Sequence, residues 1–170
     1  MKNRGWGRAG IWFALVFMVL FPASAFPRIK TLPLPELIGR SEIILIGRVV
    51  EIKVIAKPPG RSGSKDATVE NVVVPERILK GRWPRGKPMS FITHERRLDG
   101  RPIWREDALT FPEKGSRVVL FVARNPGGDL GVVNGIQGLW PLGPDGKPLK
   151  MGSRYTVAEL EREIARAGRK

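Results

Sequence analysis

Four arginines and a tryptophan gather in one stretch of the chain, residues 94–110. Guanidinium groups bind carboxylates and phosphates through paired hydrogen bonds, and an indole ring can stack on a sugar or a base. The stretch shows no sustained periodicity, so it predicts a long loop that could hold an anionic polymer. The alternative is a solvated loop whose tryptophan packs against the rest of the fold. The residues concerned are Arg96, Arg97, Arg101, Trp104 and Arg105.

The residue types of the chain give little support for a catalytic function. His94 is the single histidine, cysteine is absent, and no serine lies in a G-x-S-x-G motif. One histidine without cysteine does not build a typical zinc site. We therefore expect no catalytic residue, no cofactor and no metal site. The carboxylates near the arginine-rich stretch lack the spacing of a calcium loop and are interpreted as surface charge: Asp99, Glu106, Asp107 and Glu113.

The first 25 residues predict a signal peptide. A basic segment, residues 1–10, precedes an unbroken apolar run over residues 11–21, and the Ala-Ser-Ala of residues 23–25 has the small-x-small pattern of a cleavage site. The apolar run is shorter than the ~20 residues that a membrane-spanning helix needs. We expect cleavage before Phe26 and export to the periplasm or the extracellular space. An uncleaved membrane anchor is the alternative.

The chain is strongly basic. It contains 30 lysines and arginines against 16 acidic residues, a net charge of +14 over 170 residues. The leader holds three of the basic residues and no acidic one, which leaves +11 for residues 26–170. Such a charge attracts nucleic acid, anionic polysaccharide, lipid headgroups or acidic proteins. It also fits a generally basic composition that marks no site.

β-Branched residues dominate the elements that must position any site. Residues 43–55 are continuously apolar at first and alternate after Gly47, which predicts a long strand with a bulge or bend at the glycine. A second strand is expected over residues 69–79, where Pro75 marks an edge or a bulge. Shorter strands are expected over residues 89–93, 117–123 and 130–134, with a brief last strand near residues 149–151.

Helices are expected at the two ends of this β-rich region. Residues 34–38 predict a short helix with Pro35 in its first turn. Thr156 and Glu159 form a capping-box pattern at the start of a C-terminal helix. The few strands and the glycine corner favour a closed or nearly closed barrel. The prediction is a mainly-β fold: a small five-to-six-stranded OB-like barrel with a short N-terminal helix and a C-terminal amphipathic helix.

The expected domain organisation follows from these elements. After the leader, residues 1–25, the two prolines of residues 26–33 predict an extended arm. Residues 34–170 are then expected to form a single OB-like β-barrel domain with its C-terminal helix. A chain of this length can bury a core without disulfides, which the lack of cysteine excludes.

Three parts of the chain carry a resemblance to a known family: residues 41–50, 74–81, and 115–122 together with 134–138. They contain a bent first strand, a Lys-Gly turn and a buried strand after a glycine. They resemble exported bacterial proteins related to the netrin-like and tissue-inhibitor-of-metalloproteinase-like domains, over roughly residues 36–140. The resemblance implies an OB-type barrel. The eukaryotic inhibitors chelate a protease's zinc through an N-terminal cysteine, which this chain lacks, so the resemblance implies the fold more than inhibition.

These observations lead to three expectations about function. The first is a non-enzymatic exported domain that binds a protein partner at the cell envelope. The second is an electrostatic binder of an anionic polymer (polysaccharide, lipid headgroup or nucleic acid) through the arginine-rich stretch. A hydrolase that uses His94 or Asp107 ranks third. We expect no specific nucleic-acid site and no transmembrane span after the leader.

Overall fold

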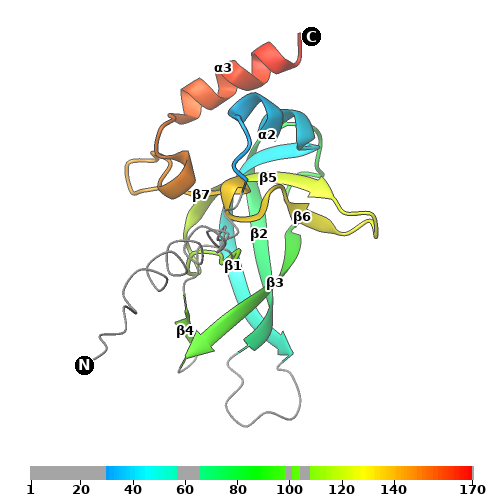
Figure 1. Cartoon of the computed structure of the whole chain (residues 1–170), viewed down its shortest axis with the longest axis vertical. Helices are drawn as coiled ribbons and strands as arrows, with labels where there is room; N and C mark the ends of the chain where they lie inside the picture. Colours follow the sequence, from blue (N-terminus) through cyan, green and yellow to red (C-terminus); the bar gives the residue numbers. More distant parts are fainter. Residues whose placement is uncertain (1–29, 57–65, 99–100, 104–107, 170) are drawn as a thin grey trace, which may run out of the picture. The chain divides into compact units, whose positions relative to one another are not determined.

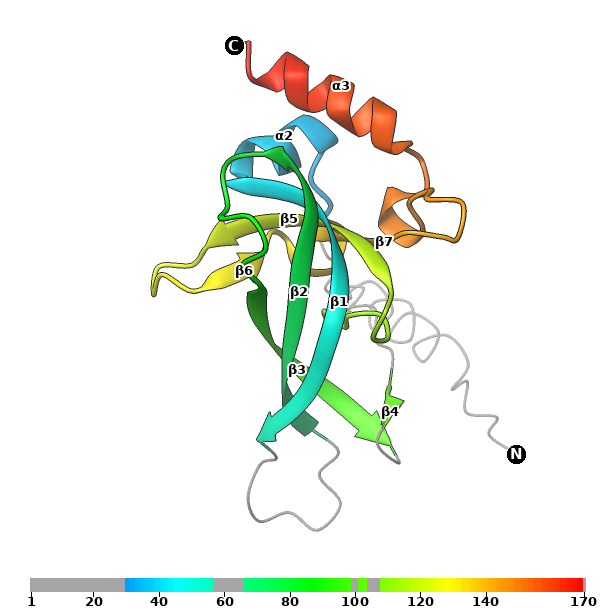
Figure 2. The same ribbon diagram turned by 180° about the vertical axis from the view of Figure 1, so that it is seen from behind.

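A computed structural model describes residues 30–56, 66–98, 101–103 and 108–169 of the chain. The expected signal peptide, residues 1–25, and residues 26–29 of the expected arm lie outside the described residues. Thr31–Lys170 forms a compact unit, which Figures 1 and 2 show from opposite sides.

The compact unit is built on a curled antiparallel sheet. In the described part of the chain the sheet has seven strands in the order β4-β3-β2-β1-β5-β6, with β7 paired to β5. β6 also approaches β3, so the sheet curls into a half-barrel. The strands are β1 (Ile43–Ala56), β2 (Asp66–Lys80), β3 (Met89–Leu98), β4 (Arg101–Pro102), β5 (Arg117–Arg124), β6 (Leu130–Val132) and β7 (Leu139–Pro141).

The predicted bend in β1 is present at Gly47. The β1–β2 register shifts between Ile46 and Gly47, which face the neighbourhood of Pro75 on β2. A Cβ atom at Gly47 would lie 2.6 Å from Val73 Cγ1, so a side chain at this bend would clash with β2. The glycine therefore allows the two strands to approach and coil together.

Two helices cover the outer face of the sheet at one end. They are α2 (Leu34–Arg40) and α3 (Val157–Ala167), and they lie side by side in both views. The predicted capping box of α3 is confirmed, because Thr156 and Glu159 each accept a hydrogen bond from the other's backbone N–H. The prediction of a mainly-β barrel flanked by two helices is confirmed as a half-barrel, with seven strands in the described residues where five or six were expected.

Apolar side chains form one layer inside the curled sheet and a second layer between the sheet and the helices. On β1, Leu45 belongs to the inner layer while its neighbours Ile44 and Ile46 belong to the outer layer. Trp140 and Leu160 extend the outer layer toward α3. The start of β1 is continuously apolar because both of its faces are covered.

Two sequence-based expectations about local structure are wrong. Residues 94–110 do not form one long loop, because β3 continues to Leu98 and turns into β4. Residues 149–151 do not form a strand, because Lys150–Gly152 is a turn of 3₁₀ helix, η2, which begins with a positive φ of 52° at Lys150. A second 3₁₀ turn, η1, spans Gly135–Gly138. Every helix in the described part of the chain is too short or too polar to cross a bilayer.

Candidate functional site

The arginine-rich stretch does not form a single basic surface. Arg96 and Arg97 are neighbours on β3, and successive strand residues point to opposite faces. Arg96 is exposed and lies 3.6 Å from Asp66, whereas Arg97 is 18% exposed and forms a 2.7 Å ion pair with Glu95. Arg101 is exposed on β4. The other two predicted site residues, Trp104 and Arg105, lie outside the described residues.

Glu95 and Arg97 belong to a polar cluster inside the curled sheet. Glu95 is only 3% exposed, and its carboxylate also accepts a hydrogen bond from the Thr93 hydroxyl. Asn71, fully buried on β2, donates to the Thr93 hydroxyl over 2.9 Å. Arg97 therefore neutralises a buried carboxylate, which makes this arginine a structural residue.

The single histidine lies beside a threonine of the neighbouring strand. His94 lies on the outer face of β3, and its Nδ1 is 3.3 Å from the Thr68 hydroxyl. Among the residues that the structure describes, no group of three or more histidine or acidic side chains could hold a metal ion. Asp99, Glu106 and Asp107 lie outside the described residues.

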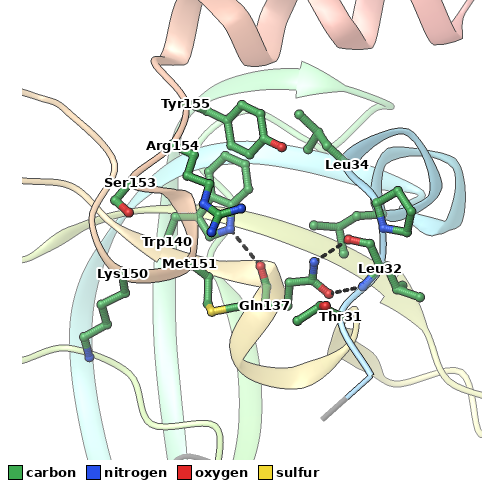
Figure 3. Close-up of a pocket in the computed structure, with 12 residues that line it drawn as sticks. Thr31, Leu32, Leu34, Gln137, Trp140, Lys150, Met151, Ser153, Arg154 and Tyr155 are labelled. Carbon is green, nitrogen blue, oxygen red and sulfur yellow. Dashed lines mark hydrogen bonds between the residues drawn. The ribbon is translucent and has the colours of Figure 1, made fainter. Parts of the chain in front are cut away.

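A pocket of about 590 Å³ opens where the N-terminal approach to α2 meets the connection between η2 and α3. Figure 3 shows this pocket from close range. Sites that bind small molecules typically have volumes of ~300–1,000 Å³, so the pocket is large enough for a ligand or for side chains of a partner. Its lining combines the segment Thr31–Leu34 with Gln137, Trp140 and the segment Lys150–Tyr155.

Gln137 fixes one wall of the pocket. Its side-chain carbonyl accepts a hydrogen bond from Leu32 N–H over 2.8 Å, and its amide donates to the Leu32 carbonyl over 2.6 Å. Its own backbone carbonyl accepts a 2.7 Å hydrogen bond from the Trp140 indole. The two bonds to Leu32 join the approach to α2 to the 3₁₀ turn η1, and the bond from Trp140 joins η1 to β7. Figure 3 draws all three.

Gly152 fixes the opposite wall. A Cβ atom at this position would lie 2.5 Å from the ring of Trp140, so only glycine lets η2 pack on the indole. Tyr155, three residues further along the chain, stacks on Trp140 with 5.7 Å between the ring centroids and an interplanar angle of 8°. The Tyr155 N–H also donates to the Gly152 carbonyl. The two walls are thus held by packing and hydrogen bonds before any ligand binds.

The charge of the pocket lining is positive. Among the described residues, the lining includes Lys150 and Arg154 and no carboxylate. Figure 3 shows Arg154 reaching toward the middle of the pocket and Lys150 extending away from it. Arg154 is exposed, and no hydrogen bond or ion pair joins it to another residue in the described part of the chain.

Glu159, the first acidic residue after Arg154 in the sequence, is hydrogen-bonded to Thr156. The Glu159 carboxylate accepts hydrogen bonds from the Thr156 N–H and hydroxyl, and these bonds lower the pKa of Glu159 below its ordinary value. A negative charge at this position stabilises the start of α3 and its helix dipole. It therefore stays in the capping box, and the Arg154 guanidinium remains available for an external anion.

The sequence analysis did not find this site. Gln137 and Leu32 are 105 residues apart, so no spacing in the sequence links them. Arg154 is one arginine among many in a basic chain. The strongest available signal was Gly152, which follows a turn and precedes the capping box of α3.

No family model matches the chain, and no curated protein matches it. The resemblance to netrin-like and tissue-inhibitor-of-metalloproteinase-like domains therefore stays a prediction.

Proposed function

We propose that this chain is a non-enzymatic exported domain that binds a protein partner at the cell envelope through the pocket between η2 and α2. The observation that carries the proposal is a preformed pocket into which the guanidinium of Arg154 projects, with no bonding partner among the residues that the structure describes. Preorganised sites bind more tightly because less conformational entropy is lost on binding. The netrin-like resemblance and the predicted signal peptide are parts of the same proposal.

The pairing of the arginines favours a protein partner over an anionic polymer. A polymer is held by several cations along one surface, and its affinity grows with the number of such contacts. Arg96 and Arg97 point to opposite faces of β3, and each has a carboxylate partner. The pocket offers the Arg154 guanidinium within a lining of mixed polar and apolar residues, an arrangement suited to side chains of a folded or extended protein.

The pocket chemistry supports a binding role rather than a catalytic one. The lining residues that the structure describes include neither a carboxylate nor a histidine that could act as a general base for the Ser153 hydroxyl. Acyl and glycosyl transfer both require such a group within hydrogen-bonding reach of the reacting atom. These described residues can bind and orient a ligand.

Site-specific photocrosslinking tests the proposal. A photoreactive amino acid would replace Met151, which lines the pocket and is 37% exposed, in the purified exported chain. The matched control carries the same group at Ile92, an exposed residue on β3. After irradiation with envelope extract, we expect a discrete protein linked at position 151 and not at position 92, at low and at high salt.

Two results would overturn the proposal. One is capture of the same proteins at both positions, which would indicate non-specific association of a basic surface. The other is retention of anionic polymer alone, released by salt, which would move the site to the arginine-rich stretch.

A further inference from the structure

Resting on the proposed function, we infer that the pocket recognises an acidic residue flanked by an apolar side chain in an extended segment of the partner. Arg154 would bind the carboxylate, and the apolar walls of the pocket would take the neighbouring side chain. The inference names the chemistry of the ligand, which the proposed function leaves open.

The charge arrangement selects an anion. A guanidinium can form two parallel hydrogen bonds with one carboxylate, a geometry that fixes the orientation of the ligand as well as binding it. Since the described lining residues include no acidic one, none of them competes for Arg154. Figure 3 shows the Tyr155 hydroxyl pointing across the pocket toward Leu34, where it can donate a further hydrogen bond to a bound segment.

The apolar surface selects the neighbour of that anion. Met151, which lies below Arg154 in Figure 3, is 37% exposed and offers most of the apolar surface of the pocket. Leu32 and Leu34 lie across from Arg154 and are 7% and 8% exposed, so they add only the edges of their side chains. Covering apolar surface gains ~25 cal/mol per Å², so a Leu, Ile or Phe side chain beside the carboxylate would add to the affinity.

The shape of the pocket favours a peptide segment over a polyanion. One guanidinium in a hollow of about 590 Å³ can neutralise one negative charge, whereas a polyanion is bound by a row of cations. The second lining cation, Lys150, extends away from the middle of the pocket. Binding should therefore depend weakly on salt, as expected for a single charge pair next to buried apolar contacts.

The test uses displayed random 12-residue peptides selected on the purified exported chain. We expect enriched peptides that share an Asp or Glu next to an aliphatic or aromatic residue. One enriched peptide would then be synthesised with capped ends, together with a version in which the acidic residue is replaced by its amide. Affinities would be measured by fluorescence anisotropy for the wild type and for Arg154→Ala.

A double-mutant cycle identifies the contact. Loss of a charged hydrogen bond corresponds to a decrease in affinity of roughly tenfold or more. We expect this loss for Arg154→Ala with the acidic peptide, the same loss for the amide peptide with the wild type, and no further loss when the two changes are combined. The matched control is Arg162→Ala, which removes an equal charge from an exposed position on α3 and should leave the affinity unchanged.

The inference is overturned if no peptide is enriched, if the enriched peptides lack acidic residues, or if Arg154→Ala binds them as tightly as the wild type. Thermal unfolding of Arg154→Ala confirms that the variant is folded. If Met151 still crosslinks one partner while the carboxylate test fails, the proposed function stands and the inference falls. If crosslinking at Met151 also fails, both fall.

Discussion

The β3–β4 hairpin and the pocket beside α2 lie at opposite ends of the sheet, and they use arginine in opposite ways (Figures 1 and 2). The hairpin carries more arginines, yet Arg96 and Arg97 face opposite directions and each lies beside a carboxylate. The pocket has a single arginine pointing into it, and Arg154 has no partner in the described part of the chain. Whether a cation can bind a ligand depends on its pairing and its surroundings, and the local density of arginine is a poor guide.

The comparison also separates stability from function. A buried ion pair is costly to break, because removal of one partner leaves the other charged and desolvated. An exposed, unpaired arginine contributes little to stability. Substitution of Arg97 should therefore lower the free energy of unfolding, and substitution of Arg154 should lower the affinity for a ligand.

The largest effect is expected from Arg97→Ala. This change leaves the buried Glu95 without its ion-pair partner, so it should lower the free energy of unfolding by about 3 kcal/mol. The control Arg96→Ala removes an exposed pair and should cost less than about 1 kcal/mol. Urea unfolding of both variants measures the difference. Equal losses for the two neighbours would show that Arg97 is not structural and would remove the contrast between the two regions.

Gly152→Ala is expected to have the next largest effect. The added methyl would lie 2.5 Å from the Trp140 ring and force η2 away from it, at a cost of about 1–3 kcal/mol. Gly39→Ala is the matched control, because nothing lies within 4 Å of a Cβ there and alanine favours the helix. Thermal unfolding should show a lower midpoint for the first variant and an equal or higher midpoint for the second. A neutral Gly152→Ala would mean that the pocket wall is not tightly packed.

A smaller effect concerns pH. The folded pKa of Glu159 is lowered by its bonds with Thr156, so its contribution to stability is present above the ordinary glutamate pKa and is lost as the pH falls through the folded value. Glu159→Gln should flatten the rise of stability with pH in the acid range below about pH 4.3. Thr156→Ala removes the hydroxyl donor and keeps the backbone N–H bond, the larger cause of the lowered pKa, so it should flatten the rise less. In the Glu159→Gln background it should cause no further flattening. A wild-type pH profile in Glu159→Gln would contradict the capping box.

The smallest effect on stability is expected from Arg154→Ala. Because the guanidinium makes no bond in the described part of the chain, the free energy of unfolding should change by less than about 0.5 kcal/mol. Chemical unfolding checks this value. A loss comparable to that of Arg97→Ala would assign Arg154 a structural role and would leave the pocket without an available cation.

The elements that were predicted correctly depend on local chemistry. The bend at Gly47 and the capping box of Thr156 and Glu159 are each encoded within a few residues, so they can be read from the sequence. The length of β3 could not be read in this way, because Glu95 and Arg97 are charged residues on the inner face of a strand. Their mutual pairing permits a burial that the sequence pattern alone argues against.

The pocket depends on contacts between distant parts of the chain. The Gln137 side chain replaces backbone partners for Leu32 across 105 residues, and Trp140 becomes a pocket wall because η2 returns to pack on it. No spacing in the sequence links Trp140 to the 3₁₀ turn that packs on it. Tertiary contacts of this kind carry no periodicity, which is why the candidate site first becomes visible in the folded chain.

The most direct test of the central claim compares Arg154→Ala with the double variant Arg96→Ala/Arg101→Ala. The partner crosslinked at Met151 would be titrated against each purified chain by isothermal calorimetry. We predict a roughly tenfold or greater loss of affinity for Arg154→Ala, in line with the loss of one charged hydrogen bond, and an unchanged affinity for the double variant. The opposite pattern, with binding lost in the double variant and kept in Arg154→Ala, would contradict the account and place the site on the β3–β4 hairpin.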